Sequence, residues 1–89
     1  MLKRIGVSYK TEIITESKQV SPEKCACISF ENIGNDDATI NNDIPLKTAN
    51  VPREFNNEYD CVIQDNFLIK FEGNSEDQAV LVIKTFYNC

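Results

Sequence analysis

The 89-residue sequence contains no histidine and no tryptophan, and only 3 of its residues are glycine. Without histidine, the chain lacks the commonest general base and the commonest zinc ligand. A Ser-His-Asp or Cys-His catalytic arrangement is therefore excluded within this chain. No other group of residues forms a recognisable catalytic motif. We expect a protein that is not an enzyme and that carries no cofactor.

Long apolar runs and clustered positive charges are also missing. The longest apolar run is residues 79–83, which is far shorter than the roughly 20 residues that cross a bilayer as a helix. The N-terminus lacks the apolar core of a signal peptide. The net charge is -5, and only Lys3 and Arg4 form a basic cluster. Because phosphate contacts need clustered Lys and Arg, we do not expect nucleic acid as a partner. From the short apolar run and the lack of a signal-peptide core, we expect no membrane partner and synthesis in a cytoplasm.

The cysteines leave three interpretations open. They are Cys25, Cys27, Cys61 and Cys89. In the absence of an export signal, reduced thiols that pack as small apolar groups are favoured over a disulfide. A zinc site would need all of these thiolates to converge, and Cys-x-Cys is a weaker zinc signal than Cys-x2-Cys. Cys25 and Cys27 are expected to share one face of a strand.

Among the segments of the sequence, the acidic and amide residues between positions 35 and 43 come closest to the pattern of a calcium site. Asp36, Asp37 and Asp43 offer oxygen ligands at short spacing. The order of an EF-hand loop is absent, and Asn and Asp are also the residues that tight turns use. We therefore predict turns here and no bound metal.

Alternation of apolar and polar residues predicts strands along most of the chain. It is clear at 5–15, 26–30, 67–71 and 79–87, with turn-forming residues at 21–24, 34–37, 41–43 and 73–77. No segment has the period of an amphipathic helix. This pattern predicts an all-β fold: one domain over residues 1–89, built as a small antiparallel β-sandwich or barrel of six to eight short strands.

Several local expectations follow from the same pattern. The strand at 25–33 is predicted to form a hairpin with 38–41 through a four-residue loop. A strand is also predicted at 61–64. Residues 47–58 have little period and are predicted to be mostly loop.

The two ends of the chain carry the candidate contact residues. Residues 1–17 alternate strongly and predict an extended strand or a docking arm. Both faces of 79–87 are largely apolar, so this strand is either central with both faces covered or contacts another subunit through one face. The predicted interface residues are Ile5, Val7, Tyr9, Val80, Leu81, Val82 and Ile83.

A series of turn and strand motifs between residues 26 and 87 resembles a known family. The motifs are Asn32-Ile33-Gly34-Asn35, Ala38-Thr39-Ile40-Asn41, Ile44-Pro45-Leu46, the alternating Phe67, Ile69 and Phe71, and the closing Val80, Val82 and Ile83. The series is similar to small β-sandwich virion proteins of tailed bacteriophages. The chain departs from their pattern at Asn42-Asp43, where Asn-Gly is usual, and at 49–55, where a Pro-Gly-x-Ser loop is usual. Its low glycine and its Asn, Ile and Lys content resemble phages of Bacteroidetes hosts, including the crAss-like group.

The resemblance implies a structural role in a virion. The protein would be capsid-associated, as a head decoration or a head-fibre anchor, and would act through repeated contacts with capsid or fibre subunits and in a homo-oligomer. It would be assembled in the cytoplasm of the host bacterium. A collar or tail component is one alternative. A free-standing binding or inhibitor module that acts on a host protein is another.

Overall fold

The computed structural model of the chain describes residues 6–48, 51–56, 61–73 and 76–88. Within these ranges it forms eight β-strands and no helix. The strands are β1 (Gly6–Ile14), β2 (Lys18–Val20), β3 (Cys27–Asn32), β4 (Ala38–Ile40), β5 (Ile44–Leu46), β6 (Arg53–Asn56), β7 (Phe67–Phe71) and β8 (Val80–Asn88).

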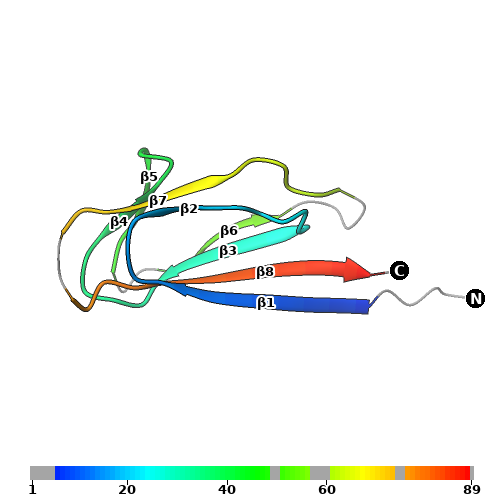
Figure 1. Cartoon of the computed structure of the whole chain (residues 1–89), viewed down its shortest axis with the longest axis horizontal. Helices are drawn as coiled ribbons and strands as arrows, with labels where there is room; N and C mark the ends of the chain where they lie inside the picture. Colours follow the sequence, from blue (N-terminus) through cyan, green and yellow to red (C-terminus); the bar gives the residue numbers. More distant parts are fainter. Residues whose placement is uncertain (1–5, 49–50, 57–60, 74–75, 89) are drawn as a thin grey trace, which may run out of the picture.

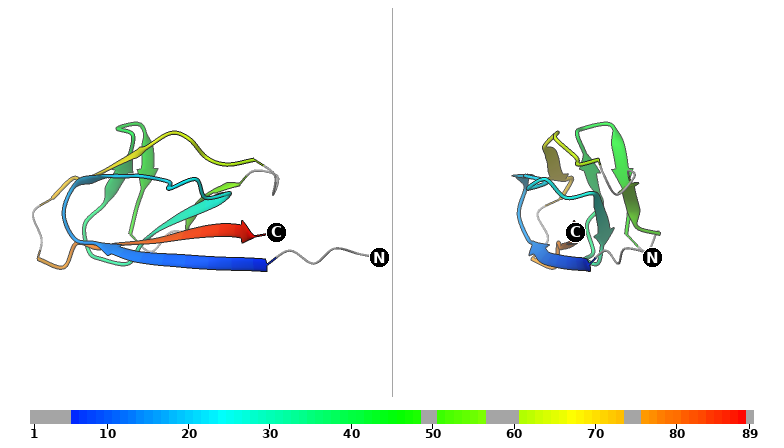
Figure 2. Two further views of the ribbon diagram at one scale, coloured as in Figure 1. Left: turned by 45° about the vertical axis from the view of Figure 1, so that its right-hand side comes forward. Right: turned by 90° about the vertical axis from the view of Figure 1, so that its right-hand side faces the viewer.

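The strands form two four-stranded antiparallel sheets that pack as a sandwich, as predicted (Figure 1). The first sheet has the order β1-β8-β3-β6, and the second has the order β2-β7-β4-β5. The two layers are seen from the end in the right-hand view of Figure 2. Strands β1 and β8 lie side by side over their whole length, with Gly6 opposite Asn88 and Ile14 opposite Val80.

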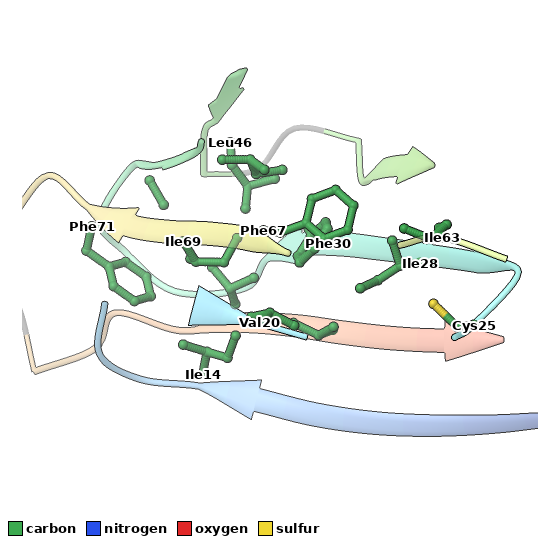
Figure 3. Close-up of a cluster of buried hydrophobic side chains, with 14 residues drawn as sticks. Ile14, Val20, Cys25, Ile28, Phe30, Leu46, Ile63, Phe67, Ile69 and Phe71 are labelled. Atoms are coloured by element: carbon green, nitrogen blue, oxygen red, sulfur yellow. The ribbon is translucent and has the colours of Figure 1, made fainter. Parts of the chain in front are cut away.

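The core lies between the sheets and is almost entirely apolar (Figure 3). In strand β7 the alternation of the sequence matches the exposure of the side chains: Phe67, Ile69 and Phe71 are buried, while Leu68 and Lys70 are exposed. Burying each large apolar side chain contributes about 1.5–3 kcal/mol. The most completely buried large side chains are Phe30, Ile14, Ile28, Ile40, Ile69, Val20, Val80 and Val82.

The predicted hairpin between 25–33 and 38–41 is wrong. Strands β3 and β4 lie in different sheets, and the segment between them crosses from one layer to the other. The backbone of this segment is bound instead to the residue that precedes β8, because the amides of Ile33 and Gly34 both donate to Ala79 O at 3.1 Å. The local hairpin is β4–β5, which turns through Asn41 and Asn42 at φ values of 56° and 70°. Asn tolerates this left-handed conformation better than most residues.

Of two further local predictions, one is wrong and the other holds only in part. Residues 61–64 form no strand, although the amide of Ile63 donates to Cys25 O at 2.8 Å and its side chain joins the core. Within the predicted loop 47–58, residues 53–56 form β6, which pairs with β3. Phe55 explains the second case, because its ring packs at 6.1 Å from that of Phe30.

The side chain of Asn32 links the segment between β3 and β4 to both sheets. Its side chain is buried, with 6% of its surface exposed. Nδ2 donates to Asp36 O at 2.7 Å and to Leu46 O at 2.9 Å, while Oδ1 accepts from the amide of Gly34 at 3.1 Å. Leu46 belongs to β5 and Asn32 to β3, so one amide side chain joins the two layers.

Replacing Asn32→Ala should lower the free energy of unfolding by about 2–4 kcal/mol, because it leaves two carbonyls and one amide without their partner. Urea denaturation measures this loss. Asn35→Ala is the matched control, since the Asn35 side chain makes an exposed hydrogen bond to Asp77 at 3.2 Å. We expect the control to lose less than about 0.5 kcal/mol. Equal losses in the two variants would contradict the role given to Asn32.

Candidate protein-contact face

The register of β1 against β8 decides which predicted interface residues are available. Val7 and Tyr9 of β1 lie on the same face as Leu81 and Ile83 of β8, and this face points away from the core. The sequence prediction thus selected residues that the structure brings together, while Ile5 lies outside the described residues.

Val80 and Val82 do not belong to this face. Both side chains are 0% exposed and pack in the core between the sheets. Their inclusion is corrected, because a fully buried side chain has no surface to offer a partner. Residues 80 and 82 point inward for the same reason that 81 and 83 point outward, since successive side chains of a strand alternate between faces.

The outer face of β1 and β8 carries no charged residue. We call these eight residues the outer face: Val7, Tyr9, Thr11, Ile13, Leu81, Ile83, Thr85 and Tyr87. The side chains of Val7, Tyr9 and Ile13 are 46%, 68% and 59% exposed, so large apolar groups lie open to solvent. At strand spacings, the face is roughly 25 Å long and 10 Å wide. An uncharged face with several exposed large apolar side chains is a candidate interaction site.

Tyr87 adds a polar atom that stays neutral. Its hydroxyl lies 3.8 Å from Cys27 Sγ, and residue 27 lies opposite Thr85 on the same face. This hydrogen bond is the main cause that raises the pKa of the Tyr87 hydroxyl above its ordinary value of 10.0. At neutral pH the side chain is therefore uncharged, and it can form hydrogen bonds without the cost of burying a charge.

Charge returns at the border of the face and on the other sheet. On the β3 and β6 side, Glu31 lies opposite Leu81 and Glu54 lies opposite Ser29. The outward residues of the second sheet are more polar, with Gln19 opposite Leu68 and Thr39 opposite Lys70. The two outer surfaces of the sandwich therefore differ, and the first sheet has the more apolar one.

The inner face of the ribbon formed by β1 and β8 carries ion pairs. Lys10 and Lys84 lie opposite each other there, and both reach the carboxylate of Glu23, at 2.8 Å and 3.5 Å. Lys18 and Glu12 pair at 3.2 Å. The Lys84 side chain is 7% exposed, so Glu23 supplies the partner that a buried ammonium needs.

A tight turn brings Glu23 to these lysines. The amide of Cys25 donates to Pro22 O at 2.9 Å, and Glu23 and Lys24 between them have φ values of 54° and 66°. The turn predicted at 21–24 is thus present, with its central pair one residue later than Pro22 would set them. The hydrogen bond from Lys10 is the main cause that holds the pKa of Glu23 below its ordinary value.

Cys25 and Cys27 do not share a face. Cys25 follows the turn and is fully buried in the core, where burial raises the pKa of its thiol. Cys27 begins β3 and points to the outer face, half-buried. The expectation of a shared face is wrong because strand geometry starts only at residue 27. Among the described residues, no three His, Cys, Asp or Glu side chains are close enough to hold a metal ion.

A hollow in the described surface lies beside strand β6. It has a volume of about 680 Å³ and is lined by residues of β6 and of the segment 62–67, with Glu54, Phe55, Ile63 and Asp65 among its walls. It lacks a convergent group of titratable side chains, so it offers weaker grounds for a function than the outer face does.

Comparisons with protein families, curated proteins and solved structures find no match to this chain. None of the described segments forms a helix that is long and apolar enough to cross a bilayer. The outer face and the residues around it are therefore the basis for a function.

Glu23→Gln should change how stability depends on pH. The folded-state pKa of Glu23 is lowered from 4.5, so the stabilising effect of its charge is present above that value and is lost as the pH falls through the folded-state pKa. The wild type should melt at a higher temperature than the variant at pH 7, and the difference should be smaller at pH 3. Thermal unfolding followed by circular dichroism tests this. A difference that is the same at both pH values would contradict the ion-pair role of Glu23.

Proposed function

We propose that this protein is a structural component of a tailed-bacteriophage virion, bound to the capsid as a head decoration or as the anchor of a head fibre. The observation that carries the proposal is the uncharged outer face of β1 and β8, which lies on a four-stranded sheet and is not covered by any described part of the chain. The setting in a virion rests on the resemblance of its turn and strand motifs to small phage sandwich proteins.

The chemistry of the face suits a contact that is made many times. A face without charges is inexpensive to desolvate, and Tyr9 and Tyr87 add hydrogen-bonding hydroxyls to a broad apolar area. Such a face is small for a tight one-to-one complex, because stable interfaces bury roughly 800 Å² on each partner. In a shell that presents many copies, each contact can be weak and the assembly still holds through avidity.

The charge distribution favours a partner surface that is apolar at its centre and basic at its edge. Glu31 and Glu54 border the face on one side only. The whole chain has a charge of -5, so the charged surfaces of two copies repel each other. A contact through the neutral face avoids most of this repulsion, since the charged groups of the ribbon point to its other side.

Density-gradient sedimentation tests the proposal. Lysate of the bacteria that produce the protein naturally, with a tagged copy of the wild type or a variant expressed in trans, is fractionated and analysed by mass spectrometry. The wild type should sediment with the major capsid protein in many copies per particle. Ile83→Lys should lower the particle-bound fraction at least about tenfold, because it places a charge at the centre of the contact.

The control is Leu68→Lys, which places the same charge on an exposed residue of the second sheet. It should sediment with the particles like the wild type. Circular dichroism verifies that both variants are folded. A wild-type protein that stays in the soluble fractions would contradict the virion proposal, and a stable soluble complex with one host protein would favour the alternative of a host-binding module.

A further inference from the structure

Strand β1 is an open sheet edge. It stands at the end of the order β1-β8-β3-β6, and no described strand lies on its other side. Its nine residues pair with β8 in one continuous register from Gly6 to Ile14, so no bulge interrupts it, and it contains no proline. Proteins usually protect such edges with prolines, bulges, charged side chains or a covering segment, because unpaired backbone groups attract another strand. Of these, β1 carries only the charges of Lys10 and Glu12, which are of opposite sign.

We propose that β1 pairs with β1 of a second copy of this chain, antiparallel and with a two-fold axis at Thr11. In an antiparallel pair, the side chains of two residues that lie opposite each other point to the same face of the sheet. A two-fold axis perpendicular to the sheet must therefore pass between one residue and the same residue of the second copy. With the axis at Thr11, Lys10 stands opposite the second copy's Glu12 and Tyr9 stands opposite its Ile13. Each of these pairs occurs twice.

This register places favourable partners opposite each other at every central position. Opposite charges, an aromatic ring beside a β-branched side chain, and two threonines are all cross-strand pairs that stabilise sheets. On the inner face the new ion pairs extend those within each copy. The result is a row of charges that alternate in sign: Glu23 and Lys10 of one copy, followed by Glu12 and Lys18 of the second copy.

Neighbouring registers lack this match. An axis at Lys10 sets two Lys10 side chains against each other, and an axis at Glu12 sets two carboxylates against each other. An axis at Tyr9 leaves Glu12 opposite Gly6 and leaves Lys10 opposite Ser8. Since like charges opposite each other destabilise a strand pair, only the register at Thr11 satisfies both charged residues.

The pairing would join the two first sheets into one sheet of eight strands. The outer faces of the two copies would then be continuous, which doubles the uncharged area. A strand pair of seven residues buries less than a standard interface, so we expect dissociation constants in the micromolar range, roughly 10–100 μM. The inference deepens the proposed function by naming a second copy as one partner, but it concerns the edge of β1 and is tested separately from the outer face.

Sedimentation velocity on the purified full chain, with reductant present to prevent disulfides, tests the register. The wild type should pass from monomer to dimer between about 5 and 500 μM. Lys10→Glu and Glu12→Lys each turn both ion pairs into like-charge pairs, so each variant alone should dimerise at least about tenfold more weakly. An equimolar mixture of the two should regain the dimer, because a mixed pair again places Glu opposite Lys at both positions.

The matched controls are Lys70→Glu and Glu72→Lys, which make the same changes of charge at exposed residues outside β1 and should dimerise like the wild type. Circular dichroism confirms folding. A wild type that is monomeric at 500 μM, or a mixture that dimerises no better than its components, would overturn the proposal. Loss of the dimer in Ile83→Lys, with full dimerisation in Lys10→Glu, would also overturn it and would assign self-association to the outer face.

Discussion

The structure depends on one constraint: strand β8 is apolar on both faces, and the described part of the chain supplies a covering sheet for only one of them. Val80 and Val82 take the inner side and are completely buried. Leu81 and Ile83 then face outward, and Val7, Tyr9 and Ile13 of β1 extend the apolar surface on the same side. In a sandwich of 89 residues, burying both faces would require a third layer.

The rest of the ribbon is arranged around that surplus face. Charged residues of β1 point inward, where Glu23 and Lys18 pair with them, and so the outer side is left neutral. This inverts the usual alternation of an antiparallel sheet, in which polar side chains point outward to solvent and apolar side chains point to the core. The inversion is stable because the turn at Pro22–Cys25 brings a carboxylate over two lysines, one of which is buried.

The sequence predicts those strands whose alternating residues match their exposure in the structure. In 67–71 the prediction is correct, because Phe67, Ile69 and Phe71 are buried while the residues between them are exposed. Strand β6 could not be predicted, since one phenylalanine, Phe55, fixes it through contacts with rings from β3 and β7. The faces of β8 could not be told apart either, because a strand with two apolar faces gives no sign of which one its second sheet will cover. That choice follows only from the register with β1 and β3.

Amide hydrogen exchange at several protein concentrations tests most directly whether the open edge of β1 is a contact surface. In an edge strand, alternate amides point away from the neighbouring strand. The account predicts that these amides of β1 exchange more slowly as the concentration rises, while those of β5, the edge of the second sheet, do not change. Outward amides of β1 that exchange at the same rate at every concentration, as those of β5 do, would contradict it.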